Sequence, residues 1–357
     1  MRDFKYKWEE FKKLPLSKKK KLLIRDKELS YLIFSQQFDR ENIEVLFRLA
    51  DKIRDLSKNK AAADKLQTLL SHKRATLFFS QPSTRTFKSF YNACHILGIK
   101  TTELRDGTSS SQKKGESPED TILTFASYTD LIIMRNNEEW LAEKSSWLLN
   151  KKNRVVKVIN AGSGKDQHPT QSLLDAYTLD IAFKDKKGID GKTIAIVGDL
   201  KRGRAARSLI YILKNYKTIK LILISPDSLK IEPDVKKFLI KNKIKFTETD
   251  KLKENLKKAD VIYMTRIQDE YDTNNESKSI DYSGFHLKKS HLRLIKKDAI
   301  IMHPLPRRDE IDIEIDDDKR AWYWKQERNG MWARAALIAY MFGKMDEVMS
   351  YEFNSAF

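Results

Sequence analysis

Short apolar runs that alternate with amphipathic stretches constrain the fold of this chain more than any other feature. The clearest run, Thr193–Val197, is nearly continuous in apolar residues, which is typical of a strand buried on both faces. Similar runs predict further strands, which we place at residues 75–80, 130–134, 154–159, 221–225, 261–264 and 299–302. Strands that alternate with helices predict an α/β fold with mostly parallel sheets.

Helix signals lie between these runs. Ser117 and Pro118, with acidic residues in the following turn, mark one helix start, and Gly98 marks a helix end. Further helices are predicted at 171–183, 208–213, 235–240 and 331–349. A length of 357 residues suits about two domains. We predict a basic extension over 1–30, a first domain over 31–166 that a C-terminal helical segment over 331–357 completes, and a second domain over 167–330.

The formal net charge of +19 is the main compositional bias. Residues 1–30 hold 11 Lys and Arg against 5 Asp and Glu, a net +6, and the rest of the excess is spread along the chain. Most of it is lysine without interleaved aromatic residues, and no nucleic-acid motif is present. We therefore expect a solvated lysine-rich surface, which would also favour an anionic substrate.

Several classes of protein are disfavoured. No apolar stretch approaches the roughly 18 residues of a membrane span, and the first 30 residues lack the apolar core of a secretory signal. Cys94 is the single cysteine, so we expect no disulfide and no cysteine-based zinc site, as in a reducing cytoplasm. We expect Cys94 to be a small buried helix residue. No metal-binding constellation and no P-loop is recognisable.

A hydroxyl-rich turn follows the strand predicted at 75–80. Residues 83–86, Ser-Thr-Arg-Thr, would open the next helix directly after Pro82. Hydroxyls and backbone N–H groups at a helix N-terminus, next to a guanidinium, suit a phosphate group. The simpler interpretation is an ordinary helix cap beside a surface arginine.

Two further loops carry polar candidates. Residues 112–116, Gln-Lys-Lys-Gly-Glu, follow three serines; such a loop could close over an anion, although a solvated loop is commoner. His168 lies ahead of a helix, with Gln171 three residues on, and side chains at this spacing can face one ligand. An imidazole can donate to an oxygen whose negative charge grows in a transition state. A lone histidine is more often a surface residue, but His168 and His303 both precede proline at the ends of apolar runs.

The second half of the chain has three such turns. Residues 198–204, Gly-Asp-Leu-Lys-Arg-Gly-Arg, lack the dinucleotide-binding spacing, and their cations suit a carboxylate better. Residues 266–268, Arg-Ile-Gln, follow the strand at 261–264. Residues 303–307, His-Pro-Leu-Pro-Arg, contain two prolines that fix the backbone, so that its carbonyl groups can be aimed at a ligand.

Taken together, these segments resemble the aspartate/ornithine carbamoyltransferase family. STRT at 83–86, the KKGE loop at 113–116 and HPTQ at 168–171 match the family, while GDLKRGR at 198–204, MTRIQ at 264–268 and HPLPR at 303–307 mark its aspartate branch. The ornithine branch has a cysteine-containing turn in place of HPLPR. The resemblance covers about residues 31–345. It implies two doubly wound α/β domains, each a mostly parallel sheet flanked by helices, with the active site in the cleft between them.

The resemblance also implies a reaction and its residues. The carbamoyl group of carbamoyl phosphate would move to the amine of L-aspartate, a step of pyrimidine biosynthesis, without metal or organic cofactor. The catalytic residues would be His168, Arg85, Thr86, Arg135 and Lys114. Carbamoyl phosphate would be bound by Ser83, Thr84, Arg85, Thr86, Arg135, His168, Gln171, Leu305, Pro306 and Ser110. Aspartate would be bound by Lys114, Arg204, Arg266 and Gln268.

In the family, the lysine loop reaches a neighbouring subunit, so Lys114 and Ser110 would serve the active site of another copy in a homotrimer. Regulatory chains are possible partners. Three positions depart from the family pattern, which often has an arginine at Phe87 and acids at Gln81 and Tyr91. We suggest that a cation and its nearby carboxylates were lost together, which would leave fewer unpaired charges beside the phosphate loop.

Three alternatives stay open at this point. The acceptor could be a different amino acid, although Arg204 and Arg266 favour a dicarboxylate. The chain could be a non-catalytic homologue that serves as a binding subunit. The basic extension over 1–30 could bind nucleic acid, in which case retention on DNA would depend on salt.

Overall fold

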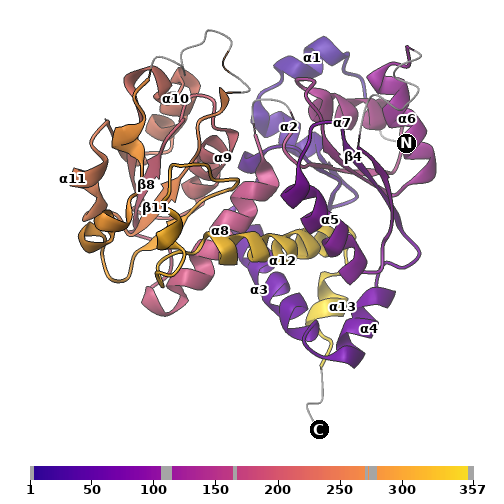
Figure 1. The fold of residues 1–357 in the computed structure, drawn as a ribbon. Coiled ribbons are helices and arrows are strands. Elements are labelled where there is room, and N and C mark those ends of the chain that lie inside the picture. Colours follow the sequence, from indigo (N-terminus) through magenta and orange to yellow (C-terminus); the bar gives the residue numbers. More distant parts are fainter. Residues whose placement is uncertain (1–3, 106–114, 164–166, 270–271, 273–279, 353–357) are drawn as a thin grey trace. The chain divides into compact units, whose positions relative to one another are not determined.

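The computed structural model describes residues 4–105, 115–163, 167–269, 272 and 280–352. The chain divides into two compact units. Unit 1 comprises residues 1–170 and 330–357, and unit 2 comprises residues 171–329. The chain passes from one unit to the other within α8 (Pro169–Phe183) and again within α12 (Tyr323–Met341) (Figure 1).

A five-stranded parallel sheet forms the centre of unit 1, in the order β3-β7-β6-β4-β5. Its strands are β3 (Tyr31–Leu32), β4 (Arg74–Phe79), β5 (Lys100–Leu104), β6 (Leu131–Arg135) and β7 (Lys157–Asn160). Its helices between the strands are α3 (Arg40–Leu56), α4 (Lys60–Thr68), α5 (Thr84–Ile96), α6 (Pro118–Tyr128) and α7 (Leu141–Lys151), with the short η1 (Ser35–Gln37). The chain runs outward from β4 to β5 and then returns to β6 on the other side of β4.

Unit 2 repeats this plan with a parallel sheet in the order β10-β9-β8-β11-β12. Its strands are β8 (Thr193–Val197), β9 (Lys220–Ile224), β10 (Lys245–Thr249), β11 (Val261–Met264) and β12 (Ile300–Met302). Its own helices are α9 (Arg204–Ile212), α10 (Pro233–Lys241) and α11 (Leu252–Leu256), and its short 3-10 turns are η3 (Lys184–Lys186), η4 (Leu213–Asn215), η5 (Asp227–Leu229), η8 (Ser283–Phe285), η9 (Lys289–Leu294) and η10 (Ile313–Ile315). Here the chain reverses direction between β8 and β11.

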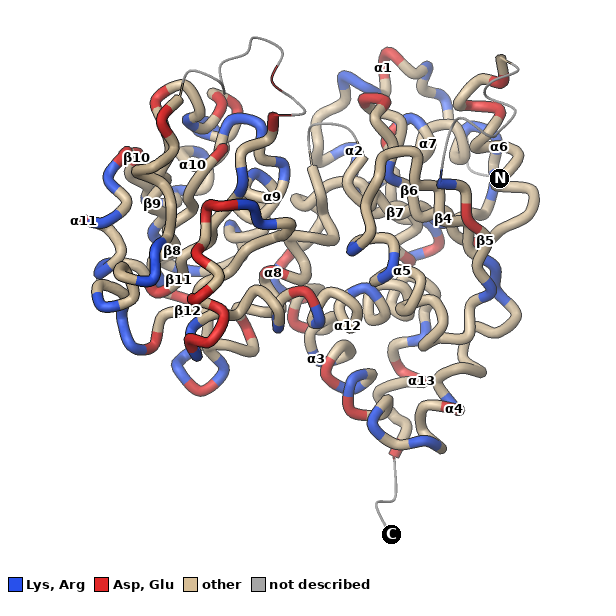
Figure 2. The backbone as a smooth tube through the Cα atoms, in the orientation of Figure 1, with Lys and Arg blue, Asp and Glu red and all other residues tan. Residues whose placement is uncertain are grey.

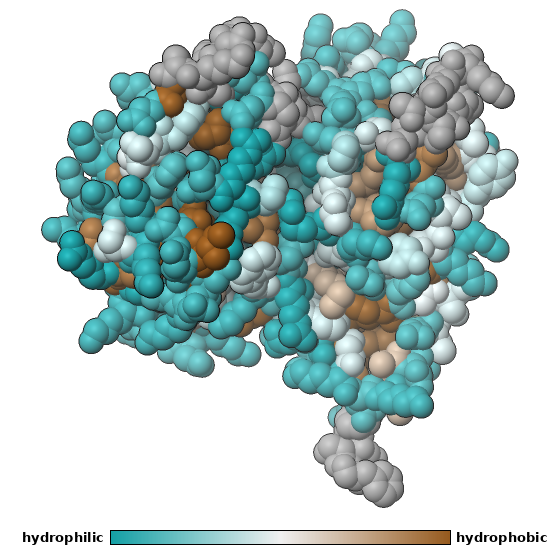
Figure 3. Space-filling model, viewed as in Figure 1, coloured by the Kyte–Doolittle hydropathy of each residue, from teal (hydrophilic) through white to brown (hydrophobic). Residues whose placement is uncertain are grey.

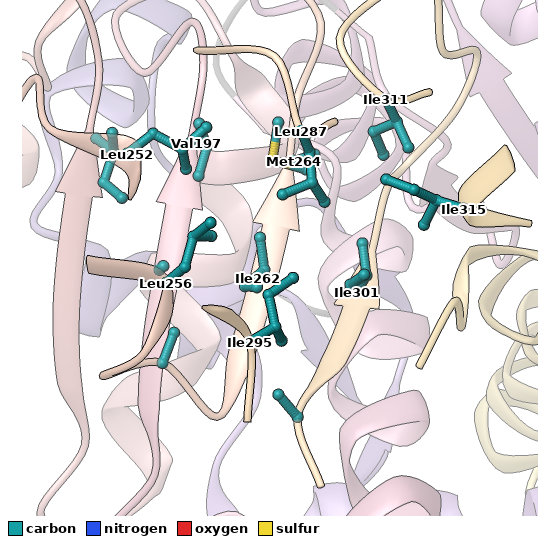
Figure 4. Close-up of a cluster of buried hydrophobic side chains, with 14 of the residues drawn as sticks. Val197, Leu252, Leu256, Ile262, Met264, Leu287, Ile295, Ile301, Ile311 and Ile315 are labelled. Atoms are coloured by element: carbon teal, nitrogen blue, oxygen red, sulfur yellow. The ribbon is translucent and has the colours of Figure 1, made fainter. Parts of the chain in front are cut away.

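Branched apolar side chains pack one face of this sheet. Figure 4 shows Val197, Ile262 and Ile301 from neighbouring strands in one cluster with Leu256 and Ile315, which come from elements outside the sheet. All five are fully buried. Burying one such side chain is worth about 1.5–3 kcal/mol, so the cluster keeps β8, β11 and β12 in a fixed register. The doubly wound α/β fold expected from the sequence is confirmed in both units.

The segment before Tyr31 belongs to unit 1, whereas the sequence placed the start of the globular pattern at Tyr31. It forms α1 (Trp8–Lys13), α2 (Leu16–Leu22) and an antiparallel pair, β1 (Ile24–Arg25) and β2 (Glu28–Leu29) (Figure 1). Phe11 is fully buried in the same hydrophobic cluster as Trp147 of α7. Lys19 forms a buried ion pair with Glu143 of α7 at 2.5 Å. Apolar and ionic contacts therefore both fix this segment to the domain.

The C-terminal segment also differs from expectation. We predicted one helix over 331–349, but α12 starts at Tyr323 and ends at Met341. A break in the helix separates it from α13 (Met345–Met349). Gly343 lies at the break with φ 64°, a left-handed conformation that commonly ends a helix. Residues 353–357 of the predicted segment lie outside the described part.

Charged residues are distributed over both units. Figure 2 shows Lys and Arg interspersed with Asp and Glu along most surface elements, and Figure 3 shows that hydrophilic residues dominate the drawn face of the molecule. This distribution agrees with a solvated lysine-rich surface. Among the helices that the structure describes, none combines the length and the apolar content that a membrane span requires.

Candidate active site

The order of strands defines where a ligand is expected in each unit. In an open parallel sheet, ligands bind at the carboxyl ends of the two strands between which the chain reverses direction. These strands are β4 and β6 in unit 1, and β8 and β11 in unit 2. The four segments that follow or end these strands carry predicted site residues: 83–86 after β4, Arg135 on β6, 198–204 after β8 and 266–268 after β11.

The Ser-Thr-Arg-Thr turn opens α5, as the sequence predicted. Ser83 is the N-cap residue, but its side chain accepts no hydrogen bond from the first turn of the helix. Thr86 is buried, and Ser83 and Thr84 line a cavity of about 230 Å³. An ordinary cap does not account for the Ser83 hydroxyl, so the interpretation as a phosphate-binding turn is favoured.

Arg135 and His168 lie against the same glycine. A Cβ atom built on Gly162 would be 3.1 Å from Arg135 Nη1 and 2.8 Å from His168 Cδ2. Gly162 has φ 101°, a conformation that side chains rarely adopt. His168 is buried, and its Nδ1 lies 3.4 Å from the Thr170 hydroxyl. The guanidinium and the imidazole can therefore approach one small ligand from the carboxyl end of β6.

Asn160, at the end of β7, holds the loop that carries Gly162. Its side-chain oxygen accepts hydrogen bonds from the backbone N–H of Gly162 at 2.9 Å and of Ser163 at 2.7 Å. Its amide donates to the backbone oxygen of Ile33 at 3.0 Å. Next to His168, Gln167 Oε1 accepts from the backbone N–H of Ser35 at 2.7 Å. Both ends of the loop are thus attached to the segment that follows β3, which makes the positions of Gly162 and His168 rigid.

Two of the three positions that depart from the family pattern, Phe87 and Tyr91, belong to an aromatic cluster beside the cavity at Ser83. Phe87 is buried, packs edge-on against Phe79 at 5.3 Å and stacks with Tyr91 at 6.1 Å between ring centres. Arg105, from the end of β5, places its guanidinium carbon 3.7 Å above the centre of the Phe87 ring. Arg105 also lines the cavity. A cation is therefore present here, but it comes from the residue after β5 and not from position 87 on α5, where the family pattern has an arginine.

Two predicted residues, Lys114 and Ser110, lie outside the described residues, as does the rest of the serine and lysine loop up to residue 114. Cys94 is buried on α5 as expected, and burial raises the pKa of its thiol to about 12. A thiol with so high a pKa is not a nucleophile at neutral pH.

In unit 2, the ends of β8 and β11 touch. A Cβ atom on Gly198 (φ 119°) would lie 2.2 Å from the backbone oxygen of Thr265, so only glycine fits there. The buried Asp199 joins the two segments, because its carboxylate accepts from the backbone N–H of Arg202 at 2.9 Å and of Gln268 at 3.2 Å. Burial raises the pKa of Asp199 above its ordinary value, against the opposing effect of Arg202 and these N–H donors.

Asp199 therefore holds together the two segments that carry the predicted aspartate ligands. The sequence suggested that Arg204 lies in the turn. In the structure it is the first residue of α9, and it is largely buried. Arg266 is partly buried, and its Nη1 donates to the backbone oxygen of Ile267 at 2.9 Å. A cavity of about 140 Å³ lies beside Gly198 and Ile267, but none of the predicted aspartate ligands lines it.

The His-Pro-Leu-Pro-Arg turn after β12 is braced by its own histidine. His303 is fully buried and pairs through Nε2 with Glu310 at 2.6 Å, and its Nδ1 accepts from the backbone N–H of Leu305 at 2.7 Å. Because Nδ1 accepts a hydrogen bond, the ring proton is on Nε2 and faces the carboxylate. Burial opposes ionisation of Glu310, but the hydrogen bond from His303 and the backbone N–H groups of Glu310 and Arg308 outweigh it, so the pKa of Glu310 is lowered. Leu305 has φ 50°, so the imidazole holds the turn in an uncommon backbone conformation.

Comparison with known proteins decides the family. A family model described as aspartate/ornithine carbamoyltransferase, carbamoyl-P binding domain, matches residues 31–180, and the Asp/Orn binding domain of the same family matches residues 190–341. The chain belongs to the aspartate/ornithine carbamoyltransferase family. The resemblance stated from its motifs is confirmed.

The most similar relatives carry a single kind of name. The aspartate carbamoyltransferase catalytic subunit of Clostridium novyi is 42% identical over 87% of this chain and 97% of its own length. The chloroplastic aspartate carbamoyltransferase of Arabidopsis thaliana is 40% identical over 87% of this chain and 77% of its own. The solved catalytic subunit of M. Jannaschii aspartate transcarbamoylase has a TM-score of 0.76 at 35% identity, and the match covers 90% of this chain and 100% of that one.

A solved carbamoyltransferase also carries both substrates. The aspartate transcarbamoylase of Trypanosoma cruzi in complex with carbamoyl phosphate and aspartate has a TM-score of 0.77 at 33% identity, over 87% of this chain and 95% of that one. Sequence reasoning took most of its candidates from the motifs that carry the resemblance to this family.

Sequence reasoning missed the buried residues that hold those motifs in place. Asp175 of α8 is fully buried and accepts from Gln171 Nε2 at 2.9 Å, Gln326 Nε2 at 2.7 Å and the Tyr263 hydroxyl at 2.7 Å. Burial, followed by the charge of Asp175, raises the pKa of Tyr263. These residues are far apart in the sequence, so only a buried aspartate on the apolar helix after HPTQ could have signalled the network. Among the residues that the structure describes, no cluster of His, Cys, Asp and Glu could hold a metal ion.

Proposed function

We propose that this carbamoyltransferase transfers the carbamoyl group of carbamoyl phosphate to the amine of L-aspartate and releases phosphate. One observation carries the proposal. In both units, groups that can bind anions lie at the point where the chain reverses direction. These groups are hydroxyls and arginines in unit 1 and arginines in unit 2. Relatives named for this reaction support it.

In this proposal, unit 1 supplies most of the residues that bind carbamoyl phosphate. The phosphate is held by the residues of the turn before and within α5, namely Ser83, Thr84, Arg85 and Thr86. The carbamoyl oxygen faces Arg135 and His168, which already share a position against Gly162. Gln171 and the backbone of Leu305 and Pro306 would accept from the carbamoyl amino group.

L-Aspartate would be held by unit 2. Arg204 and Arg266 are the two cations for its two carboxylates, and Gln268 supports them. A guanidinium binds a carboxylate through two parallel hydrogen bonds, which suits a dicarboxylate acceptor better than a basic one. The buried Asp199, which ties Gln268 to the segment before α9, would set the spacing between these groups.

The reaction needs positioning and electrostatic stabilisation more than acid–base catalysis. The aspartate nitrogen attacks the carbamoyl carbon, and a C–N bond forms. The negative charge that develops on the carbamoyl oxygen is stabilised by His168, Arg135 and Thr86. The C–O bond to phosphate then breaks, and the departing phosphate takes the proton of the amine. No redox step occurs, and no cofactor is required.

We further propose the assembly and setting that the family suggests. Three copies would form a homotrimer in which Lys114 and Ser110 of one chain complete the site of the next. The enzyme would act in the cytoplasm, as one step of pyrimidine biosynthesis.

Release of phosphate from carbamoyl phosphate in the presence of L-aspartate tests the proposal. His168→Ala should lower turnover about 10²–10³-fold, the usual cost of losing one donor to a developing oxyanion. His95→Ala, an exposed histidine on α5, is the matched control and should leave turnover within about twofold. Unchanged turnover in His168→Ala would remove His168 from this role.

A further inference from the structure

One buried carboxylate in unit 2 determines the direction of several hydrogen bonds. Asp175 is fully buried, and its carboxylate accepts from two side-chain amides and one phenol, those of Gln171, Gln326 and Tyr263. An ionised carboxylate can only accept hydrogen bonds. Each amide that faces it must therefore present its nitrogen to Asp175 and its oxygen elsewhere.

The orientation of Gln326 supports this assignment independently. Its Oε1 accepts from the backbone N–H of His303 at 2.9 Å, and a backbone N–H is always a donor. The Nε2 of Gln326 must then be the group that faces Asp175, at 2.7 Å. The acceptor character of Asp175 therefore agrees with the orientation that the backbone imposes at the other end of the Gln326 amide.

The same rule fixes Gln171. Its Nε2 donates to Asp175 at 2.9 Å, so its Oε1 points away from the carboxylate. Gln171 therefore presents a fixed acceptor, and a rotated amide, which would present a donor, would set its oxygen against the carboxylate of Asp175.

We propose that Asp175 is the residue that makes the enzyme select a carbamoyl group over an acyl group. By holding Gln171 Oε1 as an acceptor, it creates a position that pairs with the amino group of carbamoyl phosphate and offers nothing to the methyl group of acetyl phosphate. This inference rests on the proposed function, since it concerns the same substrate. Asp175 touches no substrate itself and acts as a positioning residue.

The second branch of the network reaches another acceptor. Gln326 binds the backbone N–H of His303, and the imidazole of His303 binds the backbone N–H of Leu305 at 2.7 Å. The carbonyl group of Leu305 belongs to the proline turn that would face the same amino group. One carboxylate thus orients a side chain and supports a turn, and a carbamoyl NH₂ group has two hydrogen atoms for these two acceptors.

Asp175→Asn tests the proposal, because asparagine keeps the shape but adds a donor, so that the Gln171 amide can rotate. The dissociation constants of carbamoyl phosphate and of acetyl phosphate should be measured on the purified full-length protein. The affinity for carbamoyl phosphate should fall about tenfold, the effect of one hydrogen bond, and that for acetyl phosphate should stay within about twofold. An equal fold-change in the two dissociation constants, or no change in either, would overturn the proposal.

Two further variants separate orientation from packing. Asp180→Asn, on the same helix, should change neither affinity. Tyr263→Phe removes a donor from Asp175 but leaves it an acceptor, so the ratio of the two affinities should persist. If Asp175→Asn does not fold, a lost ratio in Tyr263→Phe would refute the proposal. A wild-type protein that binds no carbamoyl phosphate would instead refute the proposed function, so the two failures are distinguishable.

Discussion

Replacing Gly162 by alanine should disturb the candidate site without removing any group that takes part in the chemistry. The new Cβ would lie 2.8 Å from His168 Cδ2 and 3.1 Å from Arg135 Nη1. Carbon atoms in ordinary contact are about 3.5–4.0 Å apart, so one or both side chains must move by roughly 0.5 Å. A misplacement of about 1 Å can cost about 10²-fold in rate. We therefore expect kcat/KM to fall about 10–100-fold.

The variant should also be less stable, because φ 101° is a strained conformation for alanine and costs about 1–3 kcal/mol. Gly188→Ala is the matched control. Gly188 also has a positive φ, 70°, but a Cβ there would meet no atom within 4 Å. It should lose stability by a similar amount and keep the kcat/KM of the wild type.

The assay is carbamoyl-aspartate formation at varied carbamoyl phosphate, with urea denaturation of the same samples. If Gly162→Ala is folded and keeps its kcat/KM within about twofold, Arg135 and His168 do not act together at this position. An equal loss of activity in Gly188→Ala would attribute the effect to backbone strain alone.

Three other outcomes follow from the structure. Arg105→Met should raise the KM for carbamoyl phosphate about 3–10-fold, because it removes a cation beside the phosphate turn. Lys100→Met, at the other end of β5, should leave this KM unchanged. Equal KM values in the two variants would make Arg105 merely structural. Lys19→Met should lower the free energy of unfolding by about 3–5 kcal/mol, because the buried Glu143 loses this ion pair, and adding Glu143→Leu should restore most of it; a loss below about 1 kcal/mol in denaturation would contradict this. Glu310→Gln should lose stability at neutral pH and approach the wild type as pH falls below 4.5, since a carboxyl whose folded pKa is lowered stabilises the fold fully above its unfolded pKa and loses this contribution as pH falls through the folded pKa; a pH-independent difference in unfolding would refute this.

The central strands could be read from the sequence because they are buried on both faces. The run at Thr193–Val197 is β8 with the same bounds, and the predicted strand at 261–264 is β11. The strands β5 and β10 were missed because they lie at the edges of their sheets. Their segments, KTTEL and KFTET, alternate with polar residues and contain no continuous apolar run.

The packing of the segment before Tyr31 could not be predicted because its charge dominates its composition. The lysine run hides Phe11 and Leu23, which are fully buried, and Lys19 is itself buried against a carboxylate of α7. A basic residue is rarely buried unless it is paired, and the partner, Glu143, is more than a hundred residues away. Such long-range pairing leaves no local pattern.

The candidate site shows the same division between local and distant information. The motifs that would touch substrate are short, so their residues could be named from the sequence. The groups that position them, Asp175, Gln326 and Glu310, are single polar residues whose meaning depends on which strands become neighbours. Arg105 is a similar case, since its contact with Phe87 arises only because β5 pairs with β4.

The choice of acceptor tests the account most directly. Purified protein should be incubated with carbamoyl phosphate and either L-aspartate or L-ornithine, and the ureido product identified by mass. We predict N-carbamoyl-L-aspartate with the first acceptor, little product with the second, and a rise in the KM for aspartate of at least about tenfold in Arg266→Met. Preferential carbamoylation of ornithine, or no product with either amine, would contradict the account.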